Sequence, residues 1–101
     1  MNPRVRFEDE ADAEYRLAGR WYEERRKHLG IEFFDATIDR IVEMPLAGNL
    51  VPRVSPAVPV RRRAVTRFPY HVIYIETATA IRVLAVAHDH RKPGYWRDRL
   101  R

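Results

Sequence analysis

Arginine is concentrated in one short stretch of the second half of the chain, at Arg61, Arg62, Arg63 and Arg67. Guanidinium groups stay charged and make paired hydrogen bonds to planar oxyanions, so this cluster could hold phosphate groups. The same pattern also fits a solvated strand edge that charge protects from aggregation. The candidate anion-binding residues are Arg61, Arg63, Arg67, Arg82, Arg91 and Lys92.

Two histidines flank Asp89, and imidazole can transfer protons or bind a metal ion. His88 and His90 would project on the same side if the preceding strand continued through them. A zinc site needs three or four protein ligands, and only His28 and His71 remain as further histidines, so we expect no metal site. A role in proton transfer and a plain position at a strand end both stay open.

Tyr95 and Trp96 follow the turn-forming pair Pro93-Gly94 and stand among basic residues. Aromatic rings among cations can stack on unpaired bases while the cations hold phosphate. Large aromatic side chains chiefly bury surface area, so for Trp96 we favour packing of the tail back onto the sheet. Tyr95 remains a candidate for chemistry or binding.

Charge is divided unevenly along the 101 residues. Residues 53–101 carry 11 Lys and Arg against 3 Asp and Glu, whereas residues 1–52 carry 8 against 11, and the net charge is +5. This asymmetry indicates an anionic partner, either nucleic acid or an acidic polypeptide. The absence of cysteine excludes disulfides, a thiolate nucleophile and Cys-ligated zinc. Without a membrane-spanning or signal-like run, we expect a soluble cytoplasmic protein with one domain, residues 1–101.

The first half of the chain predicts a strand and a pair of helices. Alternation of apolar and charged residues over 4–8 predicts a short half-buried strand. Apolar residues then recur at helical spacing behind a possible cap at Asp9, and this amphipathic helix should end near Gly30. A second helix follows and should be closed by Pro45, which makes a helical hairpin.

The second half predicts an antiparallel sheet. After an irregular, proline-bearing connection over 45–59, the apolar period changes to two, which predicts strands near 60–67, 70–75 and 80–87. Alternation in the first of these strands gathers three arginines on one strongly basic face. The economical arrangement is an α+β fold with an N-terminal strand, a helical hairpin packed on one face of a small, mainly antiparallel sheet, and a short C-terminal tail. The other sheet face would be free to bind a partner.

Three stretches of sequence carry a resemblance to a known family. They are Arg67-Phe-Pro-Tyr-His-Val-Ile-Tyr74, Val83-Leu-Ala-Val-Ala-His88 and Arg91-Lys-Pro-Gly-Tyr-Trp96. Together with the order of the predicted elements, they resemble the RelE/ParE superfamily of type II toxins, often labelled plasmid stabilisation proteins. The resemblance implies a bacterial toxin that is encoded beside an antitoxin, whose flexible segment wraps and neutralises it.

The resemblance also implies one of two targets, because RelE-like members cleave messenger RNA within the ribosome and ParE-like members poison DNA gyrase. In RelE-like toxins, arginine and lysine on the sheet hold the scissile phosphate and a tyrosine in the tail acts in proton transfer. On this chain the tyrosine matches Tyr95, and Arg61 and Arg63 could stand in for the basic pair. His88 and His90 are the further candidates for such a reaction.

Two positions depart from the RelE-like pattern. Pro69 stands where an arginine begins the middle strand, and Asp89 stands where another arginine follows the last strand. A carboxylate facing a phosphate is repulsive and weakens the electrostatic stabilisation that such catalysis needs. The segment Phe68-Pro69-Tyr70 looks closer to the ParE-like side. We therefore expect a ParE-like gyrase inhibitor that needs no cofactor, with a ribosome-dependent endoribonuclease and a non-toxic, binding-only member as alternatives.

The antitoxin that the resemblance implies would present an acidic amphipathic segment. Such a segment could lie on the basic sheet face or along the helical hairpin, where it would bury Trp21. Trp21 is therefore the candidate antitoxin-binding residue.

Overall fold

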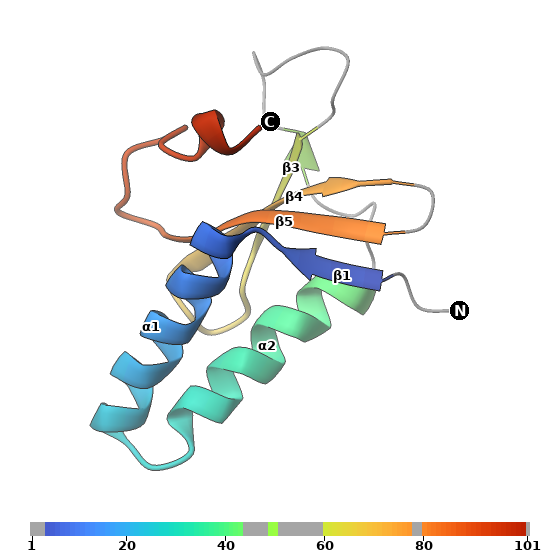
Figure 1. Cartoon of the computed structure of the whole chain (residues 1–101). Helices are drawn as coiled ribbons and strands as arrows, with labels where there is room; N and C mark the ends of the chain where they lie inside the picture. Colours follow the sequence, from blue (N-terminus) through green and yellow to red (C-terminus); the bar gives the residue numbers. More distant parts are fainter. Residues whose placement is uncertain (1–3, 44–48, 51–59, 78–79, 101) are drawn as a thin grey trace.

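The computed structural model describes residues 4–43, 49–50, 60–77 and 80–100. Strand β1 (Arg4–Phe7) leads into helices α1 (Asp9–Arg25) and α2 (Leu29–Glu43). Next come strands β2 (Asn49–Leu50), β3 (Val60–Ala64), β4 (Tyr70–Glu76) and β5 (Ala80–His88), and a 3₁₀ helix (Arg97–Arg99) lies in the C-terminal tail. The predicted α+β order is confirmed (Figure 1). Within these ranges, no helix is long and apolar enough to cross a membrane.

The five strands form one sheet in the order β1-β5-β4-β3-β2. β1 pairs with β5 in parallel, and the other neighbours pair antiparallel, so the sheet is mainly antiparallel as predicted. The two helices lie on one side of this sheet and the C-terminal tail on the other (Figure 1). Both faces are therefore covered at least in part, whereas the sequence predicted one free face.

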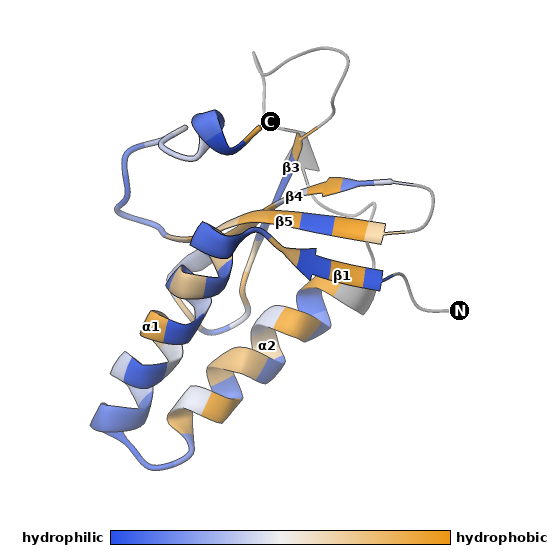
Figure 2. Ribbon diagram, in the orientation of Figure 1, coloured by the Kyte–Doolittle hydropathy of each residue, from blue (hydrophilic) through white to orange (hydrophobic). Residues whose placement is uncertain are grey.

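Each sheet face has its own apolar core. Hydrophobic residues run along β4, β5 and α2, whereas much of α1 is hydrophilic (Figure 2). The core under the helices joins Ala11, Ala18, Phe33, Ile41, Val72, Tyr74, Ile81, Val83 and Val86, among others. The core under the tail joins Val60, Ile73, Ile75, Leu84, Ala85 and Trp96. Trp96 is only 4% exposed, so it packs the tail onto the sheet as the sequence indicated.

The helices cross at a point where glycine replaces larger side chains. A Cβ on Gly30 would lie 2.5 Å from the carbonyl oxygen of Gly19, and a Cβ on Gly19 would lie 2.2 Å from Cζ of Phe34. The contact at Gly30 is with backbone, which cannot move aside, so glycine is needed there, whereas at Gly19 the ring of Phe34 would have to shift. Gly30 lies in the first turn of α2 and does not end α1, so that part of the prediction was wrong.

The boundaries of α1 also differ from the prediction. The N-cap is Glu8, without a side-chain capping bond, and Asp9 is the first helical residue. The helix ends at Arg25, and His28 adopts the positive φ of 72° that turns the chain into α2. The Glu23 carboxylate accepts hydrogen bonds from the amides of His28 (2.9 Å) and Gly30 (3.0 Å), and the His28 bond is the main reason that the pKa of Glu23 is lowered.

One residue of β5 forms a β-bulge. The register passes from Ile73 opposite Ala85 to Tyr74 opposite Val83, so Leu84 is the extra residue. Two successive side chains, Leu84 and Ala85, consequently belong to the core under the tail. The bulge reverses the alternation of the strand beyond it.

Two predicted segments need correction. β3 ends at Ala64 and not at 67, and Arg67 lies in the turn before β4 with a φ of 73°. Where an irregular connection was predicted, Asn49–Leu50 pairs antiparallel with β3. The rest of 45–59, including Pro45, and residues 78–79 between β4 and β5 lie outside the described residues.

Candidate functional site

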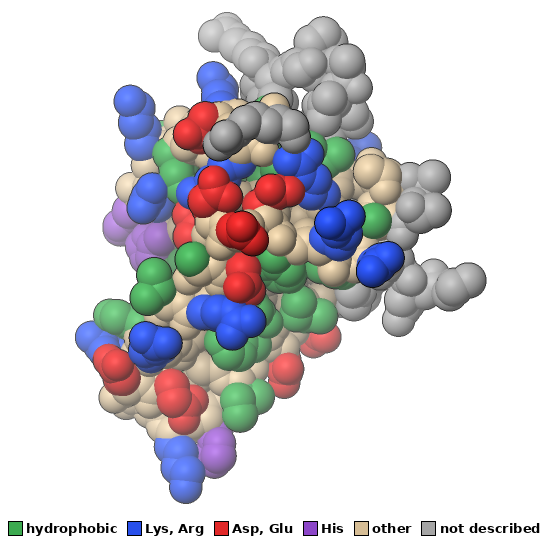
Figure 3. All heavy atoms as spheres, viewed as in Figure 1, with side chains coloured by type: hydrophobic (Ala, Val, Ile, Leu, Met, Phe, Trp, Pro, Cys, Tyr) green, Lys and Arg blue, Asp and Glu red, His purple; other side chains and the backbone are tan. Residues whose placement is uncertain are grey.

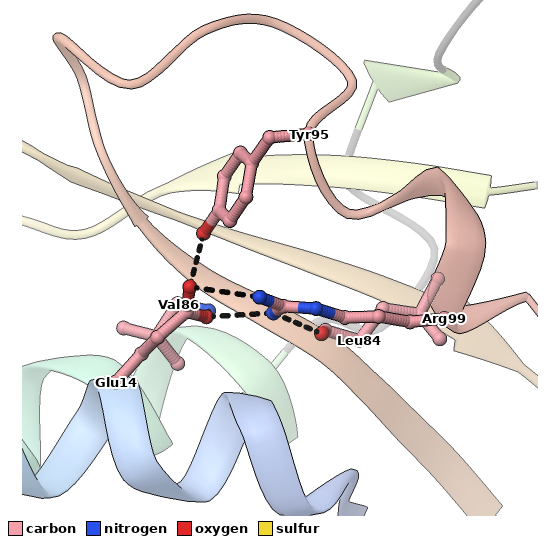
Figure 4. Close-up of polar contacts among 5 residues, drawn as sticks. All are labelled: Glu14, Leu84, Val86, Tyr95 and Arg99. Carbon is pink, nitrogen blue, oxygen red and sulfur yellow. Dashed lines mark hydrogen bonds and ion pairs between the residues drawn. The ribbon is translucent and has the colours of Figure 1, made fainter.

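The Glu14 carboxylate joins α1, β5 and the tail (Figure 4). Its Oε2 atom accepts a hydrogen bond from the Tyr95 hydroxyl at 2.5 Å. Arg99 donates to both carboxylate oxygens, at 2.9 and 3.2 Å. The backbone amide of Val86 donates to Oε1 at 3.1 Å. A single acidic side chain thus holds two residues of the tail against the end of the sheet.

Glu14 lies next to the part of β5 that extends beyond the end of β1. β1 covers β5 only as far as Val83, so the amide of Val86 and the carbonyl of Leu84 lie beyond it. Glu14 accepts from that amide, and Arg99 donates to that carbonyl at 3.0 Å. Because buried backbone groups need hydrogen-bond partners, the pair completes the strand edge that β1 leaves open.

The surroundings of Tyr95 and Arg99 shift the pKa values of both side chains. Burial, followed by the hydrogen bond to Glu14, raises the pKa of the Tyr95 hydroxyl. Burial alone would lower the pKa of Arg99, but the hydrogen bond and the charge of Glu14 outweigh it, so the pKa of Arg99 is raised. Arg91 and Arg99 lie over the Tyr95 ring at 4.0 and 5.0 Å from its centroid. Tyr95 is therefore held neutral between two cations.

Sequence reasoning did not single out Glu14 as a site residue. A signal was nevertheless present. Glu14 lies three residues after Ala11 and four before Ala18, and both alanines are buried. A carboxylate on the buried stripe of a helix requires a cationic or hydrogen-bonding partner.

A cleft of about 610 Å³ lies beside this pair, between α1 and the ends of β4 and β5. We call it the α1 cleft. Its lining is mostly apolar and comprises Glu14, Leu17, Ala18, Trp21, Tyr22, Pro69, Tyr70, Val86, His88, Arg91 and Tyr95. Leu17 and Trp21 are 62% and 51% exposed. Hydrophobic side chains reach the surface beside α1 in Figure 3.

A second hollow of about 420 Å³ lies between the tail and the sheet. We call it the tail hollow. Its cationic side chains are Arg62, Arg91, Lys92 and Arg97. His88, Arg91 and Tyr95 line both this hollow and the α1 cleft, so they form the wall between the two. Histidines gather at the left edge of Figure 3, where Figure 1 places the turn between β5 and the tail.

Arg61 and Arg63 share one side of β3, as the alternation predicted, but this is the side that the helices cover. Both lie opposite β4 residues whose side chains belong to the core under the helices, and Arg63 donates to the carbonyl of Arg40 in α2 at 3.0 Å. Arg62 is the residue of this run that faces the tail hollow. Alternation separated the two sets of side chains, but it does not tell which set the helices cover.

Two further predicted cations are engaged by acids away from Tyr95. Arg67 lies 3.8 Å from Glu32 beside α2, and Arg82 lies 2.5 Å from Glu8. The predicted anion-binding set is therefore not brought together as a unit. Of its members, Arg91 and Lys92 line the tail hollow.

The histidines meet near the end of β5. The His88 ring lies 5.1 Å from the His90 ring, and its Nδ1 accepts a hydrogen bond from the His90 amide. Asp89 lies 2.5 Å from Nδ1 of His71 and is engaged there. In the described part of the chain, no group of three or more His, Asp or Glu side chains could hold a metal ion.

No family model and no curated protein matches the sequence. Among solved structures, the chain is similar to one from the chromosomal ParDE TA (toxin–antitoxin) system of P. aeruginosa, with a TM-score of 0.64. The two sequences are 13% identical, and the likeness covers 85% of this chain and 95% of that chain. At this identity the likeness establishes the fold, so the fold that the sequence resemblance implied is confirmed.

Proposed function

We propose that this chain is the toxin of a type II toxin–antitoxin system of the ParE type. The proposal is supported by the fold that it shares with a chain of the ParDE system. It is also supported by the stretches within 67–74 and 83–96 that resemble the RelE/ParE superfamily. A cytoplasmic location is part of the proposal, because both known kinds of target for such toxins lie there.

The environment of Tyr95 carries the proposal that the toxin acts by binding. A tyrosine that transfers a proton during RNA cleavage needs a free hydroxyl next to cations that hold the phosphate. Tyr95 instead donates to Glu14, and burial together with that bond raises its pKa. Arg61 and Arg63, which would hold the phosphate, lie on the opposite side of the sheet.

DNA gyrase is the target that we propose, and controlled expression tests it. Induction of the chain alone in bacteria is expected to arrest growth, and the purified chain is expected to trap gyrase on DNA in a supercoiling reaction. Arrest with cleaved messenger RNA and unaffected gyrase would favour the endoribonuclease. Unimpaired growth with folded protein present would favour a non-toxic member that only binds.

The substitution Tyr95→Phe separates binding from RNA cleavage. The variant is expected to keep its toxicity, because phenylalanine retains the ring beneath Arg91 and loses only the hydroxyl. An endoribonuclease that uses this hydroxyl would lose about 100-fold or more of its rate. The measurement is bacterial growth at equal, verified expression of the two proteins. Loss of toxicity in a variant that still folds would contradict the proposal.

The α1 cleft is where we place an acidic amphipathic segment of the antitoxin. An apolar side chain of that segment would lie against Leu17 and Trp21, whose exposure in the free chain is otherwise unfavourable. Arg91 at the wall and Arg25, which stacks on Trp21 at 3.7 Å, would attract its carboxylates. Glu14 would repel it little, because Arg99 already neutralises that charge.

The substitution Trp21→Ala tests this placement. It is expected to weaken the complex with the product of a neighbouring antitoxin gene by about 30-fold, as expected when a central aromatic anchor is removed. Ile31→Ala is the matched control, since Ile31 is similarly exposed, at 56%, but does not line the cleft. Titration calorimetry measures both. Equal losses for the two variants would place the antitoxin elsewhere.

A further inference from the structure

The tail hollow brings four cationic side chains together. Arg62, Arg91, Lys92 and Arg97 line it, and none of them forms an ion pair within the residues that the structure describes. Other arginines of the described residues pair with a carboxylate, among them Arg16, Arg25, Arg26, Arg67, Arg82 and Arg99. Four cations that pair with no described carboxylate thus share one hollow.

The hollow holds one carboxylate among its lining residues, and that carboxylate is engaged. Asp89 lies 2.5 Å from Nδ1 of His71, which lines the hollow too. The net field inside is therefore positive, and an anion entering it meets four cations in a concave, partly enclosed space. The floor is apolar because Ile73, Ala87 and Trp96 form it.

One cation in the wall is arranged for stacking. The Arg91 guanidinium lies over the Tyr95 ring at 4.0 Å, and Tyr95 is fixed in turn by its bond to Glu14. Arg91 is itself exposed, so the second face of its guanidinium plane can receive another flat group. Nucleic-acid bases stack on guanidinium planes in this way, and carboxylates of a peptide do not.

We propose that the tail hollow binds the backbone of single-stranded nucleic acid, one nucleotide at a time, without cleaving it. The phosphate lies among Arg62, Lys92 and Arg97, and the base extends the stack of Tyr95 and Arg91. A volume of about 420 Å³ accommodates a nucleotide. This binding does not depend on gyrase being the target. The basic surface that carries it consists of Arg62 and the cations of the tail, and does not include Arg61 and Arg63.

Fluorescence anisotropy with a labelled single-stranded oligonucleotide of mixed sequence tests the proposal. The double variant Arg62→Gln/Arg91→Gln is expected to bind at least about tenfold more weakly than the parent chain, since each lost contact is charge-assisted. The control Arg16→Gln/Arg26→Gln removes the same charge from the helical hairpin and is expected to change affinity less than about twofold. The slope of log K against log[salt] should become shallower by about 0.7 in the first variant only, because Arg62 is the phosphate contact that this variant loses.

A polyglutamate peptide of matched charge and the variant Arg91→Lys distinguish nucleic acid from an acidic protein. Lysine keeps the charge but lacks the stacking plane, so Arg91→Lys is expected to weaken oligonucleotide binding and leave peptide binding unchanged. Equal losses in both double variants would overturn the proposal, because binding would then follow net charge alone. Tighter binding of polyglutamate than of the oligonucleotide would also overturn it. Circular dichroism and thermal unfolding confirm that each variant is folded.

Discussion

Replacing Glu14 by glutamine is expected to lower the free energy of unfolding by about 2 to 3 kcal/mol. The carboxylate accepts from Tyr95, Arg99 and Val86, and the side chain of Arg99 is only 12% exposed. Without the negative charge, the guanidinium remains largely buried and uncompensated. For a chain of this length the loss corresponds to a decrease in Tm on the order of 10–20 °C.

The matched control is Glu24→Gln. Glu24 also forms an ion pair, with Arg25, but both side chains are about half exposed or more, so its removal should cost less than about 1 kcal/mol. Thermal unfolding followed by circular dichroism measures both variants. The double variant Glu14→Gln/Arg99→Gln should recover part of the loss, because it removes the buried charge as well. Equal effects of Glu14→Gln and Glu24→Gln would contradict a structural role for Glu14.

Gly30→Ala is expected to destabilise the fold by about 2 kcal/mol, although alanine is the better helix former. The added Cβ would lie 2.5 Å from the carbonyl oxygen of Gly19, and a backbone atom cannot rotate out of the way. The helices must therefore separate at their crossing. Separation would also disturb the Glu23 bonds to the amides of His28 and Gly30 at the start of α2.

Denaturant unfolding measures this effect, and a second position calibrates it. Ala13 is exposed on α1, so Ala13→Gly reports helix propensity without a change in packing and should cost about 1 kcal/mol. At position 30 the preference is the opposite: alanine, the larger residue, is expected to give the lower free energy of unfolding. A Gly30→Ala variant as stable as the parent would show that the crossing can relax.

Much of the fold could be predicted from the sequence, because an element that buries one face repeats its apolar residues at a fixed spacing. Apolar spacing located α1, α2, β4 and β5, and each of these elements buries one or both faces in the structure. Elements that depend on distant contacts were not predictable in this way. The two-residue strand β2 exists through its pairing with β3, and the positive φ of His28 ends the hairpin turn without glycine.

The candidate site was less predictable, for two physical reasons. First, the alternation in β3 fixes which arginines share a side but not which side receives the helices, and both faces of this sheet are covered. Second, Glu14 is recognisable only through its partners. Arg99 and Tyr95 are more than eighty residues away in sequence, and no local pattern reports a contact at that separation.

The wall shared by the α1 cleft and the tail hollow has a thermodynamic consequence. His88, Arg91 and Tyr95 face both spaces, and Arg91 is a single side chain that adopts one position at a time. If an occupant of the cleft draws Arg91 toward itself, the affinity of the hollow for its own occupant changes by some factor. Linkage then requires the occupant of the hollow to change the affinity of the cleft by the same factor. Through this one arginine, an occupant of either space would then alter the concentration at which the other space fills.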